Sequence, residues 1–327
     1  MNEEQKAPLL EVKDLKKWFP SSKSPFSGKK QYVKAVDGVS FTLHYGETLG
    51  IVGESGCGKS TMGRSVLRLL EPTSGQIFFE GKNFTALNKK ELRKSRSELQ
   101  IIFQDPYASL DPRMTIGDII AEPLDIQLKL SEKERMERVL KMMERVGLNT
   151  RYVNRYPHEF SGGQRQRIGI ARAMILNPKV VVCDEPVSAL DVSIQAQVIN
   201  LLKDMQKEMG MAYIFISHDF SVIKHISDRV AVMYLGRVME IADKNDLYKH
   251  PMHPYTVALL SAIPVPDRKH KKEKIVLEGD LPSPVNPPSG CVFHTRCPRA
   301  QEICKTQVPQ QKDYGNGHCC ACHFPQE

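Results

Sequence analysis

Short apolar runs separated by turns make up the first part of the chain. "LLEVKDL", "VDGVSFTL" and "ETLGIVG" follow one another from residue 9 to about residue 52, and such runs predict β-strands. A helical pattern runs from Lys59 to Leu70 and ends at "EPTSG". The next run, "QIFFEG", predicts another strand. Strands and helices therefore alternate from the start.

The pattern becomes helical from about Gln104 to Tyr156. Within it, "SEKERMERVLKMMERVGL" places apolar residues at 136, 139, 140, 143 and 146, which share one helix face. Two continuous apolar runs follow, "KVVVCDEP" and "MAYIFISHD", and each precedes a helical pattern. Short strands buried on both faces and alternating with helices predict a parallel sheet covered by helices, which is an α/β fold.

The composition changes near Ile263. "IPVPDRKHKKEKIVLEGDLPSPVNPPSG" is rich in Pro, Lys and Gly and predicts a linker, and its basic run at residues 268–274 is interpreted as solvated. Six of the eight cysteines then fall between Cys291 and Cys322. We therefore expect one large domain over residues 1–262, and a linker with a small Cys-rich lobe over residues 263–327.

Charge and hydropathy limit the possible locations of the protein. The 327 residues carry a net charge of +8, but the basic residues are mostly scattered, and no nucleic-acid partner is expected. The first residues are acidic and lack the apolar run of a signal peptide. No apolar stretch approaches the roughly 18 residues of a membrane-spanning helix. A cytosolic location is expected, where disulfides are rare, so metal binding is favoured for the cysteines over disulfides.

"GIVGESGCGKST" contains the pattern G-x-x-x-x-G-K-[ST] between a predicted strand and a predicted helix. Its glycines let consecutive backbone N–H groups face phosphate oxygens at a helix N-terminus. Lys59 would reach the β- and γ-phosphates, and the Ser60 hydroxyl would bind Mg²⁺. The predicted phosphate-binding residues are Gly53, Glu54, Ser55, Gly56, Cys57, Gly58, Lys59, Ser60 and Thr61.

Two adjacent acids end the apolar run "KVVVCDEP". Asp184 closes a buried strand, where a carboxylate is costly unless a cation such as Mg²⁺ compensates it. Glu185 is placed to act as general base on the water that attacks the γ-phosphate. Together with the phosphate loop, the two acids predict hydrolysis of a nucleoside triphosphate.

A second anion site is predicted at "EFSGGQRQRIGIARAMILNP". Ser161, Gly162, Gly163 and Gln164 open a helix, and one nucleotide site does not need two such helix starts. With the motifs around it, this segment resembles the signature of ATP-binding-cassette (ABC) ATPases. The resemblance covers residues 10–250 and implies a P-loop ATPase core with a helical subdomain at about residues 104–175. It also implies head-to-tail dimers in which each ATP contacts the other chain's signature.

The same resemblance implies further site residues. Gln104 in "IIFQDP" is similar to the glutamine that senses Mg²⁺, and His218 in "ISHD" is similar to the switch histidine at the γ-phosphate. "SALD" is similar to the dimer-contact loop. An aromatic residue before the first strand pair stacks on adenine in this family. Phe19 fits by position, with Trp18 and Tyr32 as alternatives.

"FQDPYASLDPRMTIGDIIAEPL", "HPMHPYTVALLSAIPVPD" and the Cys-rich tail narrow the resemblance to oligopeptide/dipeptide importers. The extra segment "PSSKSPFSGKKQY" and the "ASLDPR" sequence are similar to the F-type ATPase of their ATPase pair. The resemblance implies a second ATPase subunit in a heterodimer, two transmembrane permeases and an extracytoplasmic peptide-binding protein. The location would be peripheral, on the cytoplasmic face of the inner membrane. Alternatives are a nickel or glutathione importer and a soluble ABC ATPase not tied to transport.

The tail's cysteine spacing leaves two metal centres open. Thiolates in a reducing compartment suit Zn²⁺ or an iron–sulfur cluster, and only Cys319 and Cys322 form a C-x₂-C pair. The tails of similar importer subunits can hold a [4Fe–4S] cluster. Matching that pattern implies Cys291, Cys297, Cys304 and Cys322 as ligands.

Overall fold

The computed structural model describes residues 7–21, 31–263 and 275–326 and divides into two compact units. Unit 1 comprises residues 43–47, 83–216 and the first nine residues, and unit 2 comprises residues 10–42, 48–82 and 217–327. The units are described one at a time. Residues 22–30 and the basic run at residues 268–274 lie outside the described residues.

Unit 1 is built on three parallel strands in the order β8-β7-β6. The central strand β7 (Val180–Asp184) pairs with β6 (Leu99–Ile102) on one side and with β8 (Ala212–Ile216) on the other. Every residue of β7 and β8 is buried, which explains their uninterrupted apolar sequences. This part of the predicted parallel sheet is confirmed.

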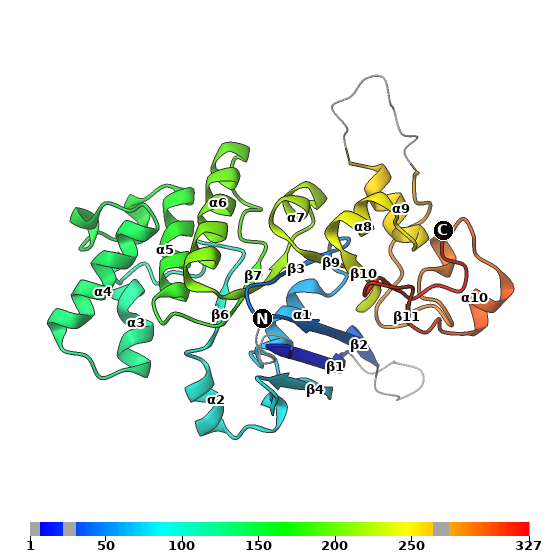
Figure 1. Cartoon of the computed structure of the whole chain (residues 1–327), viewed down its shortest axis with the longest axis horizontal. Helices are drawn as coiled ribbons and strands as arrows, with labels where there is room; N and C mark the ends of the chain where they lie inside the picture. Colours follow the sequence, from blue (N-terminus) through cyan, green and yellow to red (C-terminus); the bar gives the residue numbers. More distant parts are fainter. Residues whose placement is uncertain (1–6, 22–30, 264–274, 327) are drawn as a thin grey trace. The chain divides into compact units, whose positions relative to one another are not determined.

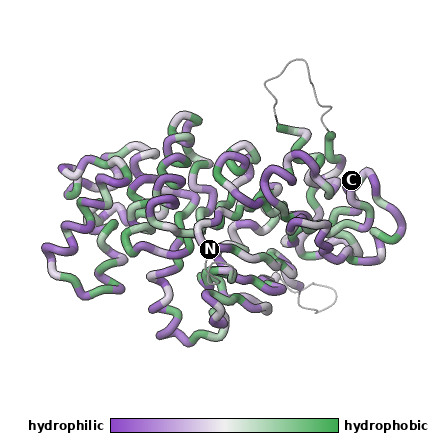
Figure 2. Tube along the Cα trace, in the orientation of Figure 1, coloured by the Kyte–Doolittle hydropathy of each residue, from purple (hydrophilic) through white to green (hydrophobic). Residues whose placement is uncertain are grey.

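Helices make up the rest of unit 1: α2 (Lys89–Ser95), α3 (Ile116–Gln127), α4 (Glu132–Arg145), α5 (Gly162–Met174) and α6 (Val192–Met209). Single 3-10 turns lie at Phe84–Ala86, Thr150–Tyr152 and Pro157–Glu159. Figure 2 shows hydrophobic and hydrophilic residues alternating along α3, α4 and α5, as expected for helices with one buried face. The helical pattern predicted from Gln104 to Tyr156 is confirmed for α3 and α4.

Unit 2 contains two groups of strands. One is an antiparallel sheet in the order β2-β1-β4-β5, formed by β2 (Tyr32–Leu43), β1 (Leu10–Pro20), β4 (Ser74–Phe79) and β5 (Lys82–Asn83). The sequence predicted β1, β2 and β4, but neither β5 nor a separate antiparallel sheet. In the other group, β3 (Thr48–Val52) pairs in parallel with β9 (Arg229–Tyr234), and β10 (Arg237–Asp243) pairs antiparallel with β9.

The helices of unit 2 are short (Figure 1). Helix α1 (Lys59–Val66) follows β3 and stops four residues before the predicted end at Leu70, and Arg68 has a positive φ of 50°. The others are α7 (Phe220–Ile226), α8 (Lys244–Lys249), α9 (Pro254–Ser261) and α10 (Glu302–Thr306), with a 3-10 turn at His294–Arg296.

The Cys-rich tail belongs to unit 2. Its strand β12 (Cys319–Cys320) pairs with β10 and with β11 (Lys312–Asp313). The buried carboxylate of Glu240 on β10 accepts hydrogen bonds from the backbone N–H groups of Met252 and His253 and lies 2.7 Å from Nε2 of His318. The tail therefore packs against β10 and the segment that leads into α9. The domain boundary near residue 262 stays a prediction.

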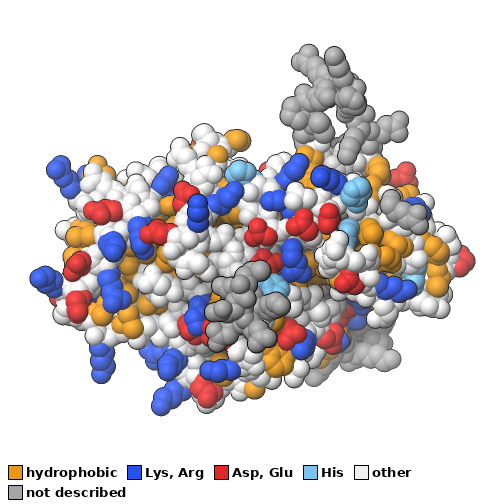
Figure 3. All heavy atoms as spheres, in the orientation of Figure 1, with side chains coloured by type: hydrophobic (Ala, Val, Ile, Leu, Met, Phe, Trp, Pro, Cys, Tyr) orange, Lys and Arg blue, Asp and Glu red, His pale blue; other side chains and the backbone are white. Residues whose placement is uncertain are grey.

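Two surface properties bear on the predicted location. None of the helices within the described ranges is both long and apolar enough to cross a membrane. Lys and Arg side chains are interspersed with Asp and Glu side chains over the face seen in Figure 3. The charges on that face are mixed, as the scattered basic residues of the sequence predicted.

Candidate functional site

The loop between β3 and α1 is shaped by glycines in unit 2. Gly53 and Gly58 have φ values of 153° and 104°. A Cβ at Gly53 would lie 2.2 Å from the carbonyl oxygen of Met233, and one at Gly58 would lie 2.0 Å from that of Ala35. Neither position has room for a side chain, so the loop passes directly against neighbouring backbone. This is the tight winding that the phosphate-loop motif predicts.

Lys59 is held over this loop. Its Nζ donates hydrogen bonds to the carbonyl oxygens of Gly53 at 2.8 Å and Glu54 at 3.0 Å, and its side chain is buried. The Cys57 thiol beside it is also buried, and burial raises its pKa although Lys59 lowers it. Its thiol is therefore a poor nucleophile, and its backbone, which accepts from Gly236 N–H, is the part that shapes the loop.

The other predicted site residues of unit 2 flank this loop or lie at the start of α7. Ser60 and Thr61 occupy the first turn of α1 and are half-buried. His218 is exposed and precedes Asp219, whose side chain caps α7 by accepting from Ser221 N–H. Ser55 and Gly56 complete the loop, and a Cβ at Gly56 would meet nothing within 4 Å.

The two predicted acids of unit 1 lie at the end of β7. Asp184 is fully buried, and Glu185 has a positive φ of 47° that turns the chain out of the strand. Gln104 donates a hydrogen bond from Nε2 to the Glu185 carboxylate at 3.0 Å. The structure therefore brings together two residues that the sequence separates by 81 positions.

The predicted signature opens α5. Ser161 is the N-cap and accepts from Gln164 N–H, while Gln164 accepts from Ser161 N–H in return, forming a capping box. A Cβ at Gly163 would lie 2.7 Å from Cγ2 of Ile194, whereas one at Gly162 would be in ordinary contact with Leu190. The helix start is therefore closely packed on one side, with Ser161 exposed.

Two arginines of α5 hold the segment that follows Gln104. Arg172 donates to the carbonyl oxygen of Ser109 at 2.7 Å. The guanidinium of Arg165 stacks on the Tyr107 ring, 3.9 Å from its centroid, and donates to the carbonyl oxygen of Pro157. Tyr107 itself is largely exposed. The signature helix and the segment after Gln104 are therefore mechanically joined within unit 1.

Three aromatic residues were candidates for stacking on adenine. The indole N–H of Trp18 donates to Asp37 at 3.2 Å, and the Trp18 ring lies 6.4 Å from that of Tyr32. Phe19 is half-buried, and its ring lies beneath Nζ of Lys17. Phe19 stays the predicted stacking residue.

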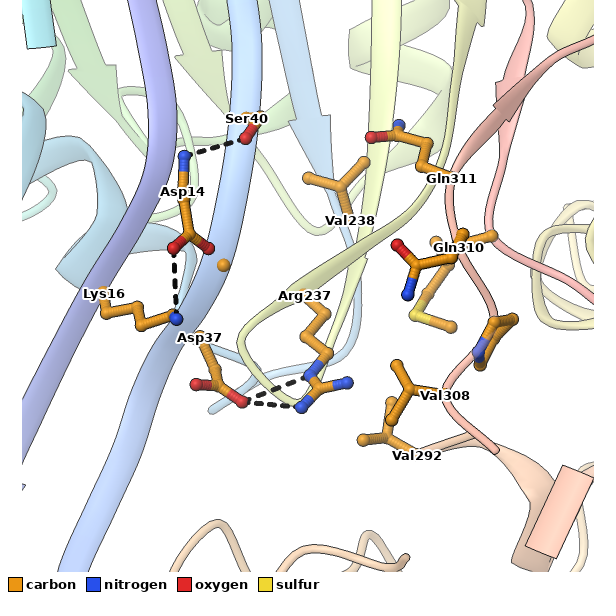
Figure 4. Close-up of a pocket in the computed structure, with 14 residues that line it drawn as sticks. Asp14, Lys16, Asp37, Ser40, Arg237, Val238, Val292, Val308, Gln310 and Gln311 are labelled. Carbon is orange, nitrogen blue, oxygen red and sulfur yellow. Dashed lines mark hydrogen bonds and ion pairs between the residues drawn. The ribbon is translucent and has the colours of Figure 1, made fainter. Parts of the chain in front are cut away.

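Asp37, which accepts the hydrogen bond from Trp18, lines a pocket of about 490 Å³ (Figure 4). Arg237 donates two hydrogen bonds to Asp37, and Lys16 pairs with Asp14 at 3.1 Å. The four charged side chains labelled in Figure 4 thus form two ion pairs. The remaining lining residues are Gly38, Ser40, Val238, Met239, Val292, Val308, Pro309, Gln310, Gln311 and Ala321.

The four cysteines predicted as ligands line one small pocket of unit 2. Cys291 and Cys304 are buried, and Cys297 and Cys322 are partly exposed. Burial raises the pKa of Cys291 to about 11. The lining of this pocket does not include Cys319 or Cys320. In the part of the chain that the structure describes, no group of three or more His, Cys, Asp or Glu side chains is arranged to hold a metal ion. The metal centre stays a prediction.

Sequence reasoning missed two partners of the phosphate loop. The hydroxyl oxygen of Tyr255 accepts a hydrogen bond from Glu54 N–H at 3.0 Å, and Arg296 donates to the Glu54 carboxylate at 2.8 Å. Arg296 directly precedes Cys297, and the sequence of this segment was interpreted only for its cysteines. Nothing local in the sequence links residues 242 positions apart.

Comparison with known proteins decides the family. A family model described as "ABC transporter" matches residues 36–188, and one described as "Oligopeptide/dipeptide transporter, C-terminal region" matches residues 239–304. The chain is 58% identical over 319 residues to the oligopeptide transport ATP-binding protein AppF of Bacillus subtilis, covering 97% of each chain. It belongs to the ABC ATPases of the oligopeptide/dipeptide transporter family.

Other relatives of this ABC ATPase agree. The oligopeptide transport ATP-binding protein OppF of Haemophilus influenzae is 57% identical over 319 residues and 96% of each chain. Among solved structures, the ATP-binding cassette MJ0796, bound to ADP and Pi in a dimer, matches with a TM-score of 0.64 at 29% identity, over 72% of this chain and 98% of that one. ATP and Mg²⁺ are the expected ligands of such a cassette.

We predict that Gly58→Ala weakens ATP binding to the isolated chain by more than about tenfold, because its Cβ would push against the Ala35 carbonyl and displace the loop. Titration with a fluorescent ATP analogue measures the affinity. Gly46→Ala is the matched control, since Gly46 also has a positive φ, 69°, but open space around it. Equal ATP affinities for the two variants would contradict the close-packing argument.

Proposed function

We propose that this ABC ATPase hydrolyses ATP to energise peptide import through membrane permeases. Lys59 and the loop N–H groups bind the phosphates, Ser60, Asp184 and Gln104 hold Mg²⁺, and Glu185 activates the attacking water. His218 binds the γ-phosphate. The backbone from Gly53 to Thr61 cradles the triphosphate, and Phe19 stacks on adenine.

The hydrogen bond between Gln104 and Glu185 carries the hydrolysis proposal. A general base must be oriented toward its water, and the amide of Gln104 fixes the Glu185 carboxylate from one side. The positive φ of Glu185 turns its side chain out of the buried strand β7. An acid that only capped a strand end would need neither feature.

The import proposal rests on the relatives. They are named oligopeptide or peptide import ATP-binding proteins, and they match this chain along nearly its whole length. The partners are then two transmembrane permeases, an extracytoplasmic peptide-binding protein and a second ATPase subunit in a heterodimer, at the cytoplasmic face of the inner membrane. The permeases would contact the segment after Gln104, which two arginines of α5 hold in place. No observation favours a nickel or glutathione importer, or a soluble ABC ATPase.

We predict that Glu185→Gln retains ATP affinity within about threefold and lowers hydrolysis at least about 100-fold, because only the base is removed. Phosphate release by the complex with its permeases, and uptake of a labelled peptide into membrane vesicles, are the measurements. Glu98→Gln, a surface acid paired with Lys179, is the control and keeps both activities. Near wild-type hydrolysis by Glu185→Gln would show that another group is the base.

We further propose that Ser161, Gly162, Gly163 and Gln164 bind the ATP held by the partner ATPase. A capped helix start with Ser161 exposed offers N–H groups and partial positive charge to an anion. MJ0796, a relative at 29% identity, forms a dimer with ADP and Pi bound. In the proposed heterodimer, the second anion site would bind the phosphates of the ATP held by the partner ATPase.

We predict that Ser161→Ala leaves ATP affinity of the isolated chain unchanged and lowers hydrolysis by the assembled complex at least about tenfold. Because Ser161 also caps α5, losing the cap alone costs about 1 kcal/mol of stability. Ser131→Ala, which removes an equivalent capping box from α4, controls for that loss. Reduced ATP binding by the isolated Ser161→Ala chain would contradict a site shared between subunits.

We also propose that Cys291, Cys297, Cys304 and Cys322 hold a [4Fe–4S] cluster, with Zn²⁺ as the alternative. The support is that these four thiols line one pocket, while Cys319 and Cys320 do not. The long spacings between the first three suit a cluster better than a zinc ribbon. When bound, the cluster would cross-link the three segments that carry these cysteines.

We predict that protein purified without oxygen shows broad visible absorption and about four iron atoms per chain. Cys297→Ser removes the absorption, whereas Cys319→Ser, outside the pocket, keeps it. Metal analysis of the same samples distinguishes the outcomes. A colourless protein with one zinc refutes the cluster, and a protein without metal refutes the ligand set.

A further inference from the structure

Arg296 links the Cys-rich tail to the phosphate loop within unit 2. It ends the 3-10 turn His294–Arg296, between Cys291 and Cys297. Its Nη1 donates to Oε2 of Glu54 at 2.8 Å, and only 9% of the Arg296 side chain and 26% of the Glu54 side chain are exposed. The pair is therefore shielded from solvent more than an ordinary surface ion pair.

Glu54 has a second partner on α9, before the tail. Its backbone N–H donates to the hydroxyl oxygen of Tyr255, whose ring lies 5.2 Å from that of the fully buried Phe293. Phe293 also packs edge-on against Tyr234 at 5.3 Å. The side chain of Glu54 is thus bound by a tail residue, Arg296, and its backbone by Tyr255, whose ring contacts the tail residue Phe293.

The charge of Glu54 bears on nucleotide binding as well as on the attachment of the tail. Glu54 lies in the loop that binds the phosphates of ATP, and a carboxylate close to a triphosphate repels it. Arg296 compensates that charge. Burial alone would lower the pKa of Arg296, but its interaction with Glu54 raises it, so the guanidinium stays charged at every physiological pH.

Anchoring the tail does not require the ion pair. Phe293 is completely buried among aromatic rings, β12 pairs with β10, and His318 is bonded to Glu240. A shielded ion pair is also weak evidence for stability, because desolvation offsets much of the attraction. The position of the pair in the phosphate loop is better explained by nucleotide binding.

We propose that Arg296 is a positioning residue of the nucleotide site, which neutralises the Glu54 carboxylate and holds it away from the phosphates of ATP. The tail thereby contributes a residue to the phosphate loop, and nucleotide affinity depends on the segment from Cys291 to Cys297. The proposal rests on the phosphate-loop function proposed above.

The test is a cycle of substitutions in the full chain, read out by the affinity for a fluorescent ATP analogue with Mg²⁺. Arg296→Gln leaves an uncompensated carboxylate in the loop and should weaken ATP binding about tenfold. Glu54→Gln is the second single variant of the cycle, and the affinity of the double variant is compared with its own. In the double variant, Glu54→Gln should restore most of the affinity lost in Arg296→Gln.

Thermal unfolding of the same variants separates charge compensation from a structural role, because removing Glu54 relieves an uncompensated carboxylate in either case. No recovery of ATP affinity in the double variant would overturn the proposal, and so would an affinity loss in Arg296→Gln that only follows a lowered unfolding temperature. So would wild-type affinity in Arg296→Gln. Arg296→Lys, which keeps the charge, should bind within about threefold of wild type. Lys305→Gln, which removes an exposed pair with Glu302 in the same tail, is the control and keeps wild-type affinity. A wild-type chain that does not bind ATP would instead refute the nucleotide site itself.

Discussion

The loop between β3 and α1 passes so close to neighbouring backbone that two of its positions exclude any side chain. Gly53 lies against the carbonyl of Met233 at the end of β9, and Gly58 lies against the carbonyl of Ala35 in β2. The Cys57 carbonyl accepts from Gly236, in the turn between β9 and β10. The loop therefore takes its shape from β2 and from the end of β9 with the turn that follows it, and the alignment of its backbone N–H groups depends on those elements.

Charge adds a second condition to this geometry. The loop contains a buried cation, Lys59, and an acid, Glu54, and it must accept a polyanion. Lys59 donates to loop carbonyl oxygens, while the carboxylate of Glu54 is directed to Arg296. The acid is thus compensated from the tail and not by the lysine that ATP binding needs. This separation leaves the ammonium of Lys59 available to phosphate oxygens.

The sequence predicted what is local and missed what is distant. The phosphate loop, the acids after β7 and the cap of α5 are each contained in a few consecutive residues, so their spacing is informative. Gln104 and Glu185 were each predicted as site residues, but the hydrogen bond between them was not, because they lie 81 positions apart in the sequence. The antiparallel sheet was missed because alternation identifies strands without identifying their partners. The ion pair between Arg296 and Glu54 could not be predicted from local sequence, because the two residues lie 242 positions apart.

The tail illustrates why composition alone misjudges such a segment. A stretch of this length, rich in Pro and Gly, cannot build a hydrophobic core of its own. In the structure, Val292, Phe293 and Cys320 are buried, and β12 extends the strands of the ATPase. The apolar residues of the tail are thus buried against the rest of unit 2 and not in a separate core. Metal at Cys291 and Cys297 would then act chiefly on the short segment between them, which is the segment that carries Arg296 to the phosphate loop. A centre far from the catalytic residues in sequence would in this way influence ATP binding through one guanidinium.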